Sequence, residues 1–124
     1  MILIFGGAYQ GKLDFALEKF DLGEKDVYTC ENEELDFSKR IIDKLEIFVR
    51  ACEEKGIDPR EYIDSHRDEL SDKILISRDE SCGLVPMDPL DRAYRETLGR
   101  TLAYIGKSAD KIYRVFVGLG QELK

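Results

Sequence analysis

The sequence lacks the features that mark proteins of membranes, secretion and nucleic-acid binding. No apolar run approaches the ~18 residues of a membrane span, and the start of the chain has neither the positive flank nor the cleavage site of a secretory signal. The formal net charge is -7, so a basic surface for nucleic acid or an anionic membrane is absent. We therefore expect a cytoplasmic protein with no nucleic-acid and no membrane partner.

Cysteine is scarce, and its spacing is uninformative. Cys30, Cys52 and Cys82 are an odd number without C-x-x-C spacing, which argues against a disulfide framework and a zinc site. We expect three reduced thiols, mostly buried.

The length of 124 residues, with 43% hydrophobic and 36% charged residues, predicts one soluble domain over residues 1–124.

The first thirteen residues contain the most informative pattern. An apolar run, Ile2–Phe5, is typical of a strand buried on both faces, and glycines and a lysine follow it. Gly6, Gly11 and Lys12 fit the G-x-x-x-x-G-K part of a phosphate-binding loop, in which backbone N–H groups surround phosphate oxygens and the lysine reaches the terminal phosphates. Leu13 stands where a magnesium-binding hydroxyl should follow. The alternative is an ordinary glycine-rich turn between a strand and a helix.

Strand-like and helix-like segments alternate along the rest of the chain. This alternation predicts an α/β fold with a mostly parallel sheet of about four strands and helices on both faces. The sheet would bring the glycine loop and the polar loop 78–86 to the same edge, where ligands gather. In the helix expected over Asp36–Lys55, Asp43 and Glu46 are predicted to face solvent. We expect strands at 2–5, 27–30, 73–77 and 111–118, and helices at 13–20, 36–55, 58–70 and 88–106.

Several short motifs follow one another along the chain in the same order as in one known family. They are Ile4–Ala8 with Gly11-Lys12, Ile76–Glu80 with Gly83–Pro86, Asp88–Leu90 leading to Tyr94–Arg100, and Ala109–Tyr113 with Gly118. Together they resemble the bifunctional adenosylcobinamide kinase and adenosylcobinamide-phosphate guanylyltransferase of cobalamin biosynthesis. The similarity covers about the first twenty residues and the C-terminal third.

The resemblance implies a three-layer fold like that of P-loop NTPases, GTP or ATP with Mg²⁺ as cofactors, and a corrinoid side chain as substrate. It also suggests a symmetric homo-oligomer. Lys12 and Glu80 would be the catalytic residues, and no metal ligand is assigned. The nucleotide would bind Gly6, Gly7, Ala8, Tyr9, Gln10, Gly11, Lys12, Leu13 and Arg100.

The sequence departs from the family at points that matter for chemistry. The family's loop has Arg-Ser where this chain has Tyr9-Gln10, and the segment with the histidine that takes up GMP is mostly missing. The only histidine, His66, is interpreted as a helix-face residue rather than a nucleophile. The acidic residue that ends an internal strand in the family should fall near 27–30, where Thr29 stands with Glu31 as the nearest substitute, or be lost with the missing segment.

Two functions are consistent with these residues. The first is a shortened enzyme, active at least as a GTP- or ATP-dependent kinase on adenosylcobinamide, with guanylyl transfer the less favoured activity. The second is a catalytically degenerate relative that serves as a nucleotide-binding or assembly module. The charged residues equally allow interpretations without a functional role. Asp79 and Glu80 can be solvated loop residues, and Arg92, Arg95 and Arg100 can pair with helix neighbours such as Glu96.

Overall fold

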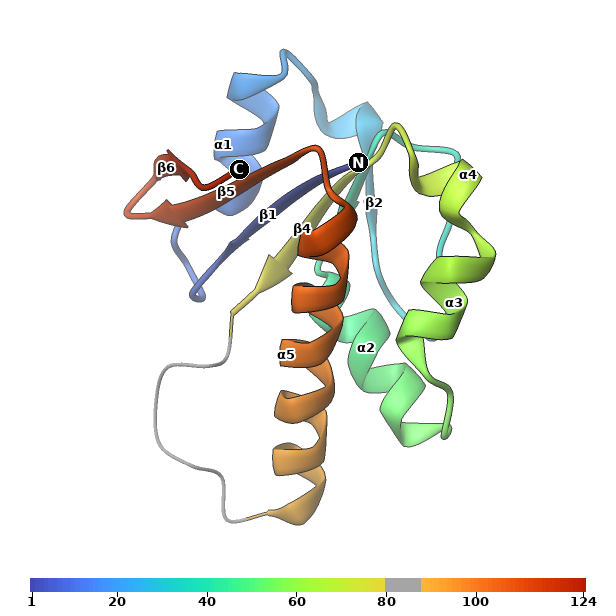
Figure 1. The fold of residues 1–124 in the computed structure, drawn as a ribbon. Coiled ribbons are helices and arrows are strands. Elements are labelled where there is room, and N and C mark those ends of the chain that lie inside the picture. Colours follow the sequence, from blue (N-terminus) through green and yellow to red (C-terminus); the bar gives the residue numbers. More distant parts are fainter. Residues whose placement is uncertain (80–87) are drawn as a thin grey trace.

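The computed structural model describes residues 1–79 and 88–124 and shows an α/β fold with a mixed six-stranded sheet (Figure 1). The spatial order of the strands is β2-β3-β4-β1-β5-β6. The predicted α/β class is confirmed, whereas the expected number of about four strands is wrong. The strands are β1 (Ile2–Gly6), β2 (Val27–Thr29), β3 (Ile41–Asp43), β4 (Ile74–Arg78), β5 (Lys111–Phe116) and β6 (Leu119–Glu122).

Helices connect the strands. Pro59 and Pro89 each occupy the first turn of a helix, and Asp58 and Asp88 cap those helices through side-chain bonds to backbone N–H groups, as the sequence predicts. Within residues 1–79 and 88–124, no helix has the length and apolar character needed to cross a membrane. The helices are α1 (Lys12–Lys19), the short 3₁₀ helix η1 (Glu24–Asp26), α2 (Leu45–Glu54), α3 (Pro59–Ser65), α4 (Arg67–Leu70) and α5 (Pro89–Ser108).

β1 lies inside the sheet between β4 and β5, and it is parallel to both. β2, β3 and β4 continue the parallel part, and among the strands of the described residues β6 alone runs antiparallel, paired with β5 at one edge of the sheet. Helices cover both faces of the sheet. Side chains of α1 pack with Ile4, Ile76 and Val115 on one face, while α2, α3 and α5 pack with Leu3 and Leu75 on the other.

β1 and β4 are parallel neighbours, but the connections that follow them leave over opposite faces of the sheet. The chain leaves β1 over one face through α1, and it leaves β4 over the other face through α5. The carboxyl ends of two neighbouring parallel strands therefore diverge, which is the position where open α/β sheets place ligands. A bond from the Asp79 N–H to the Gly6 carbonyl, 2.8 Å, joins the two ends.

The single helix predicted over Asp36–Lys55 is wrong. Ile41–Asp43 forms the buried strand β3, and α2 begins only at Leu45, after Lys44 takes a left-handed backbone with φ of 56°. The apolar residues of β3 and α2 together follow the three- and four-residue steps of one helix, which explains the wrong prediction. The buried pair Ile41-Ile42 is the β-branched feature that indicates a strand.

Two smaller expectations are also corrected. The helix predicted from Asp58 to about Leu70 is divided at His66 into α3 and α4. The segment expected to be a short tail after the last strand forms β6, which turns back along β5 through Val117 and Gly118, both with positive φ. A two-residue turn with positive φ at both positions fits the twist of an antiparallel hairpin.

The interface between α2 and the sheet gives a first test of the core. Phe48 of α2 is fully buried, and its ring meets the Tyr62 ring edge-on at 5.1 Å. We expect Phe48→Ala to lower the free energy of unfolding by about 3–5 kcal/mol, because a large cavity replaces the ring. Ile47→Ala at the neighbouring, 37% exposed position should cost less than about 1 kcal/mol. Equal losses in urea denaturation would contradict this packing.

Candidate anion-binding site

The segment between β1 and α1 is curled rather than extended. β1 ends at Gly6, Tyr9 and Gly11 take left-handed backbone conformations with φ of 59° and 81°, and α1 begins at Lys12. The Phe15 N–H donates to the Gly11 carbonyl at 3.0 Å and closes the first turn of the helix. The backbone thus reverses direction within a few residues, at the carboxyl end of a central parallel strand.

The amino end of α1 has no side-chain cap. Gly11 precedes the helix and makes no side-chain cap bond. The first N–H groups of an α-helix have no partner within the helix, and together with the helix dipole they attract anions. A glycine at this position leaves those N–H groups accessible to a ligand.

Lys12 places its ammonium group against the same loop. Its Nζ donates to the Gly7 carbonyl at 2.8 Å, so the side chain folds back toward the start of the loop. Burial lowers the pKa of Lys12, the negative charge of Glu46 partly opposes this shift, and the charge of Arg78 adds to it. Lys12 therefore releases its proton at a lower pH than an exposed lysine does.

Two carboxylates act on the charge of Lys12, and neither has the exposed position expected from the sequence. Asp43 ends β3 and is only 8% exposed, and burial raises the pKa of its carboxyl. Its Oδ1 accepts a bond from the Lys44 N–H at 2.8 Å. Glu46, in the first turn of α2, accepts the Arg78 N–H at 2.9 Å and thereby ties α2 to the end of β4.

The carboxylate at the end of an interior strand is therefore Asp43, and not a residue near Thr29. β2 is the edge strand of the sheet, and Thr29 pairs in register with Asp43 of the neighbouring β3. Sequence reasoning missed Asp43 because the wrong helix over Asp36–Lys55 turned it toward solvent. An aspartate directly after two buried isoleucines was the signal that could have identified it.

The donor set allows only a limited role for magnesium. Among the residues that the structure describes, no group of three or more histidine, cysteine or acidic side chains could hold a metal ion. Leu13 packs against the apolar cluster beneath α1 and offers no oxygen. Magnesium at phosphate sites is commonly held by one or two carboxylates together with phosphate oxygens and water. Asp43 and Glu46 fit that lesser role.

The other predicted site residues have different outcomes. Glu80 and Cys82 lie outside the described residues, as does most of the loop 78–86. Arg100 forms an ion pair with Glu96 at 3.7 Å, which is the pairing with a helix neighbour that the sequence offers as the alternative to phosphate binding. It also lines a groove of about 270 Å³ with residues at the end of α2 and the start of α3, and no residue lining that groove belongs to the glycine loop.

His66, Cys30 and Cys52 are packed against other parts of the protein. The imidazole of His66 stacks on Phe37 and Tyr62, with centroids 5.2 Å and 4.3 Å away, and its Nδ1 lies 2.8 Å from the Tyr62 carbonyl oxygen. Cys30 and Cys52 are free and buried, as expected for reduced thiols. Burial raises the pKa of Cys30 to about 12 and that of Cys52 to about 11, so both stay as thiols.

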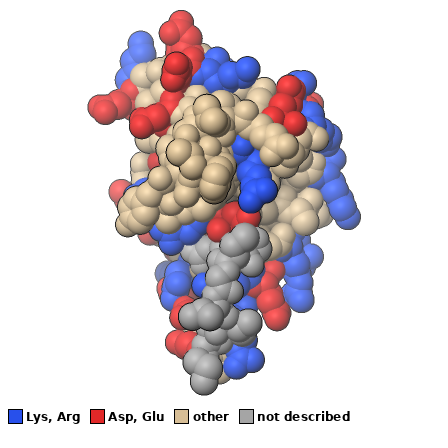
Figure 2. Space-filling view, turned by 90° about the vertical axis from the view of Figure 1, so that its left-hand side faces the viewer, with Lys and Arg blue, Asp and Glu red and all other residues tan. Residues whose placement is uncertain are grey.

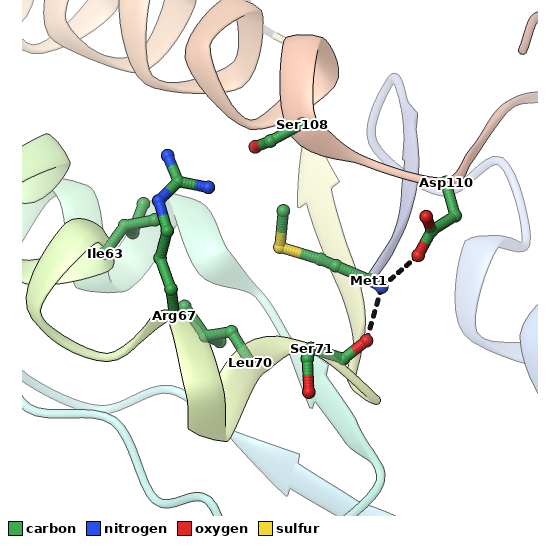
Figure 3. A pocket seen from close by; sticks show the side chains of 7 residues that line it. All are labelled: Met1, Ile63, Arg67, Leu70, Ser71, Ser108 and Asp110. Carbon is green, nitrogen blue, oxygen red and sulfur yellow. Dashed lines mark hydrogen bonds and ion pairs between the residues drawn. The ribbon is translucent and has the colours of Figure 1, made fainter.

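Two further hollows are lined by residues outside the loop Gly6–Lys12. One, of about 540 Å³, is mainly apolar and lies between α5 and β1, with Phe5 and Ile112 among its lining. The other, of about 190 Å³, lies at the amino end of β1 (Figure 3). There the Met1 amino group already bonds the Ser71 carbonyl and the Asp110 carboxylate. Because its charged groups already have partners, this hollow is a weaker candidate for a ligand site.

Charge is unevenly spread over the face that contains the β5–β6 hairpin. Figure 2 shows an uncharged area in the upper part of this face, bordered by acidic and basic side chains, with a basic group beside an acidic one near the centre of the view. Exposed apolar residues of the hairpin, Phe116, Val117 and Leu119, contribute to the uncharged surface of the molecule. Near the loop, positive potential for an anion can come from local groups such as Lys12 and the amino end of α1.

The loop depends on a glycine at its first position, which can be tested. A Cβ atom on Gly6 would lie 2.4 Å from the Val115 carbonyl oxygen, whereas one on Gly7 would meet only the Gln10 side chain, at 3.7 Å. We expect Gly6→Ala to destabilise the protein by about 1–3 kcal/mol, because two backbones must separate. Gly7→Ala should change the stability by less than about 1 kcal/mol. Denaturant unfolding that gives both variants the wild-type stability would refute the close approach.

Comparison with known proteins adds no family assignment: no protein-family model matches the chain, and no curated protein matches it closely enough to count as a relative.

Proposed function

We propose that the protein binds the phosphate groups of a nucleotide, GTP or ATP, in the loop Gly6–Lys12. The observation that supports this most directly is the combination of a curled glycine loop, an uncapped helix end and an ammonium group folded onto the same loop. These are the three elements with which backbone N–H groups and a lysine hold phosphate. They lie at the carboxyl end of β1, where the connections after β1 and β4 leave over opposite faces of the sheet, and this position supports the same conclusion.

A phosphate ligand fits better than an uncharged one for an electrostatic reason. Tyr9, the aromatic residue of the loop, is 98% exposed and so encloses no apolar pocket for a ligand. The N–H groups at the amino end of α1 and the Lys12 ammonium can bind an anion, while the nearby carboxylates of Glu46 and Asp43 act on that ammonium. A polyphosphate could accept bonds from several of these donors at once, and Lys12 would exchange its bond to the neutral Gly7 carbonyl for a bond in which donor and acceptor are both charged.

A second candidate function is phosphoryl transfer to a corrinoid, as in the family that the sequence resembles. The buried carboxylate of Asp43 favours it, because Asp43 acts on Lys12 from the end of an interior strand and could help to hold magnesium. Leu13 disfavours it, since the hydroxyl ligand is missing. Guanylyl transfer has no support from His66, whose ring stacks between Phe37 and Tyr62.

A homo-oligomer is also part of the proposal. Phe116, Val117 and Leu119 are 64%, 68% and 76% exposed at the edge of the sheet, where β6 leaves one side unpaired. Exposed apolar residues beside a free strand edge are typical of contacts between chains.

Titration with nucleotide tests the binding proposal. We expect wild-type protein to bind GTP or ATP in calorimetry and Lys12→Met to bind it about 10- to 100-fold more weakly, the loss expected when a hydrogen bond to a charged group is removed. Lys25→Met is the matched control, because Lys25 is exposed in η1 and outside the loop. It should bind like wild type.

The pH dependence gives a second readout of the same site. Burial lowers the pKa of Lys12, so this lysine loses its charge at a lower pH than an exposed lysine does. Nucleotide affinity should therefore begin to fall at a lower pH than it would if an exposed lysine bound the phosphate. Wild-type protein that binds neither nucleotide, or a Lys12→Met variant that binds as tightly as wild type, would disprove the proposed function.

Magnesium and a corrinoid acceptor separate the enzyme from the module. If the protein is a kinase, magnesium should strengthen GTP binding, and phosphate should pass from GTP to adenosylcobinamide. Asp43→Asn should then reduce the effect of magnesium and the transfer rate by about tenfold or more. Glu31→Gln, at an exposed carboxylate, is the control. Magnesium-independent binding without transfer would instead establish the non-catalytic module.

A further inference from the structure

Gln10 does not point its side-chain oxygen toward the proposed anion site. Its Oε1 accepts the Val117 N–H at 2.7 Å, and its backbone carbonyl accepts the Gly118 N–H at 2.8 Å. One residue of the glycine loop therefore binds two consecutive N–H groups of a turn more than a hundred positions away in the chain. That turn joins β5 to β6.

The turn is a conformation that needs support. Val117 has φ of 51° and Gly118 has φ of 74°. A β-branched residue in the left-handed region is a true outlier, and such residues persist where surrounding contacts determine them. The bond from the Val117 N–H to Gln10 is one such contact.

The hairpin also touches the loop and α1 along its length. A Cβ on Gly11 would lie 3.4 Å from the Gly118 Cα, so the two backbones leave no more room than a side chain's first atom would need. Next along the hairpin, the Phe15 ring of α1 covers Gly120 so closely that no side chain fits there. Together with the approach of Val115 to Gly6, these contacts follow the loop from its first residue into the helix.

We propose that the β5–β6 hairpin holds the glycine loop in its anion-binding conformation, and that Gln10 is the positioning residue that joins the two. The inference rests on the proposed function, since it concerns how that site is kept in shape. Fixing a loop before binding removes part of the ordering cost that the ligand would otherwise meet. By linkage, an anion that binds the fixed loop must strengthen the attachment of the turn by the same factor.

Gln10→Met tests the role of the side chain, because methionine is similar in length but accepts hydrogen bonds only weakly. With inorganic triphosphate as the probe, we expect its dissociation constant to rise about five- to tenfold, the effect of one typical hydrogen bond. Gln121→Met, at an exposed glutamine of β6, is the matched control and should bind like wild type. Gln10→Asn, which keeps the amide but is one methylene shorter, serves as a second variant.

Hydrogen exchange separates positioning from a merely structural role. In wild-type protein, triphosphate should slow exchange of the Val117 and Gly118 N–H groups, although neither would touch the ligand. In Gln10→Met this slowing should be lost at Val117. A variant that only destabilised the fold would exchange faster with or without triphosphate, and it would still show the slowing.

The outcomes distinguish this inference from the function on which it rests. Wild-type protein that fails to bind triphosphate overturns both. Wild-type binding that is matched by Gln10→Met and Gln10→Asn overturns only the role of Gln10. Binding without any change in exchange at Val117 and Gly118 overturns the coupling between loop and hairpin.

Discussion

The close approach of β5 to the end of β1 determines where the glycine loop can lie. The Val115 carbonyl oxygen occupies the space that a side chain at position 6 would need. Because Gly6 has no side chain, β1 can stay in register with β5 up to its last residues, and the chain can then turn sharply into α1. Without this contact the loop would be displaced from the edge of the sheet, and Lys12 would lose its place beside the ends of β3 and β4. The site therefore depends on packing between backbones before it depends on any charged group.

The sequence predicts those parts of the fold whose signals are local. The buried run of β1, the capped starts of α3 and α5 and the aromatic, β-branched β5 each contain their own evidence, and the structure confirms them. β3 was missed because three residues are too few to show a period of two, and their spacing continued that of α2. β6 was missed because Leu119–Glu122 has little strand character of its own. It is a strand because it pairs with β5, which is a long-range property of the fold.

The same division holds for the site. The glycine loop and Lys12 were predictable, because motif and neighbouring strand lie within thirteen residues. The buried position of Asp43 was not, since it follows from the missed strand. The bond between Gln10 and Val117 was not predictable either, because it joins residues brought together only by the parallel pairing of β1 with β5 and the hairpin that follows. Tertiary packing therefore gave Gln10 and Asp43 surroundings that differ from those their local sequence indicates.

The charges around Lys12 constrain how any phosphate ligand could bind. In the structure, the ammonium group is partly buried, bonded to the Gly7 carbonyl and under the influence of Glu46 and Asp43. A polyphosphate in the loop would bring further negative charge toward these two carboxylates, and like charges raise each other's pKa. Burial already raises the pKa of Asp43, and further negative charge nearby would raise it more. A divalent cation beside Asp43 would remove the same repulsion without a proton. If the loop binds phosphate, uptake of a proton or of a cation would relieve this repulsion, and a bound cation would favour phosphate transfer over simple binding.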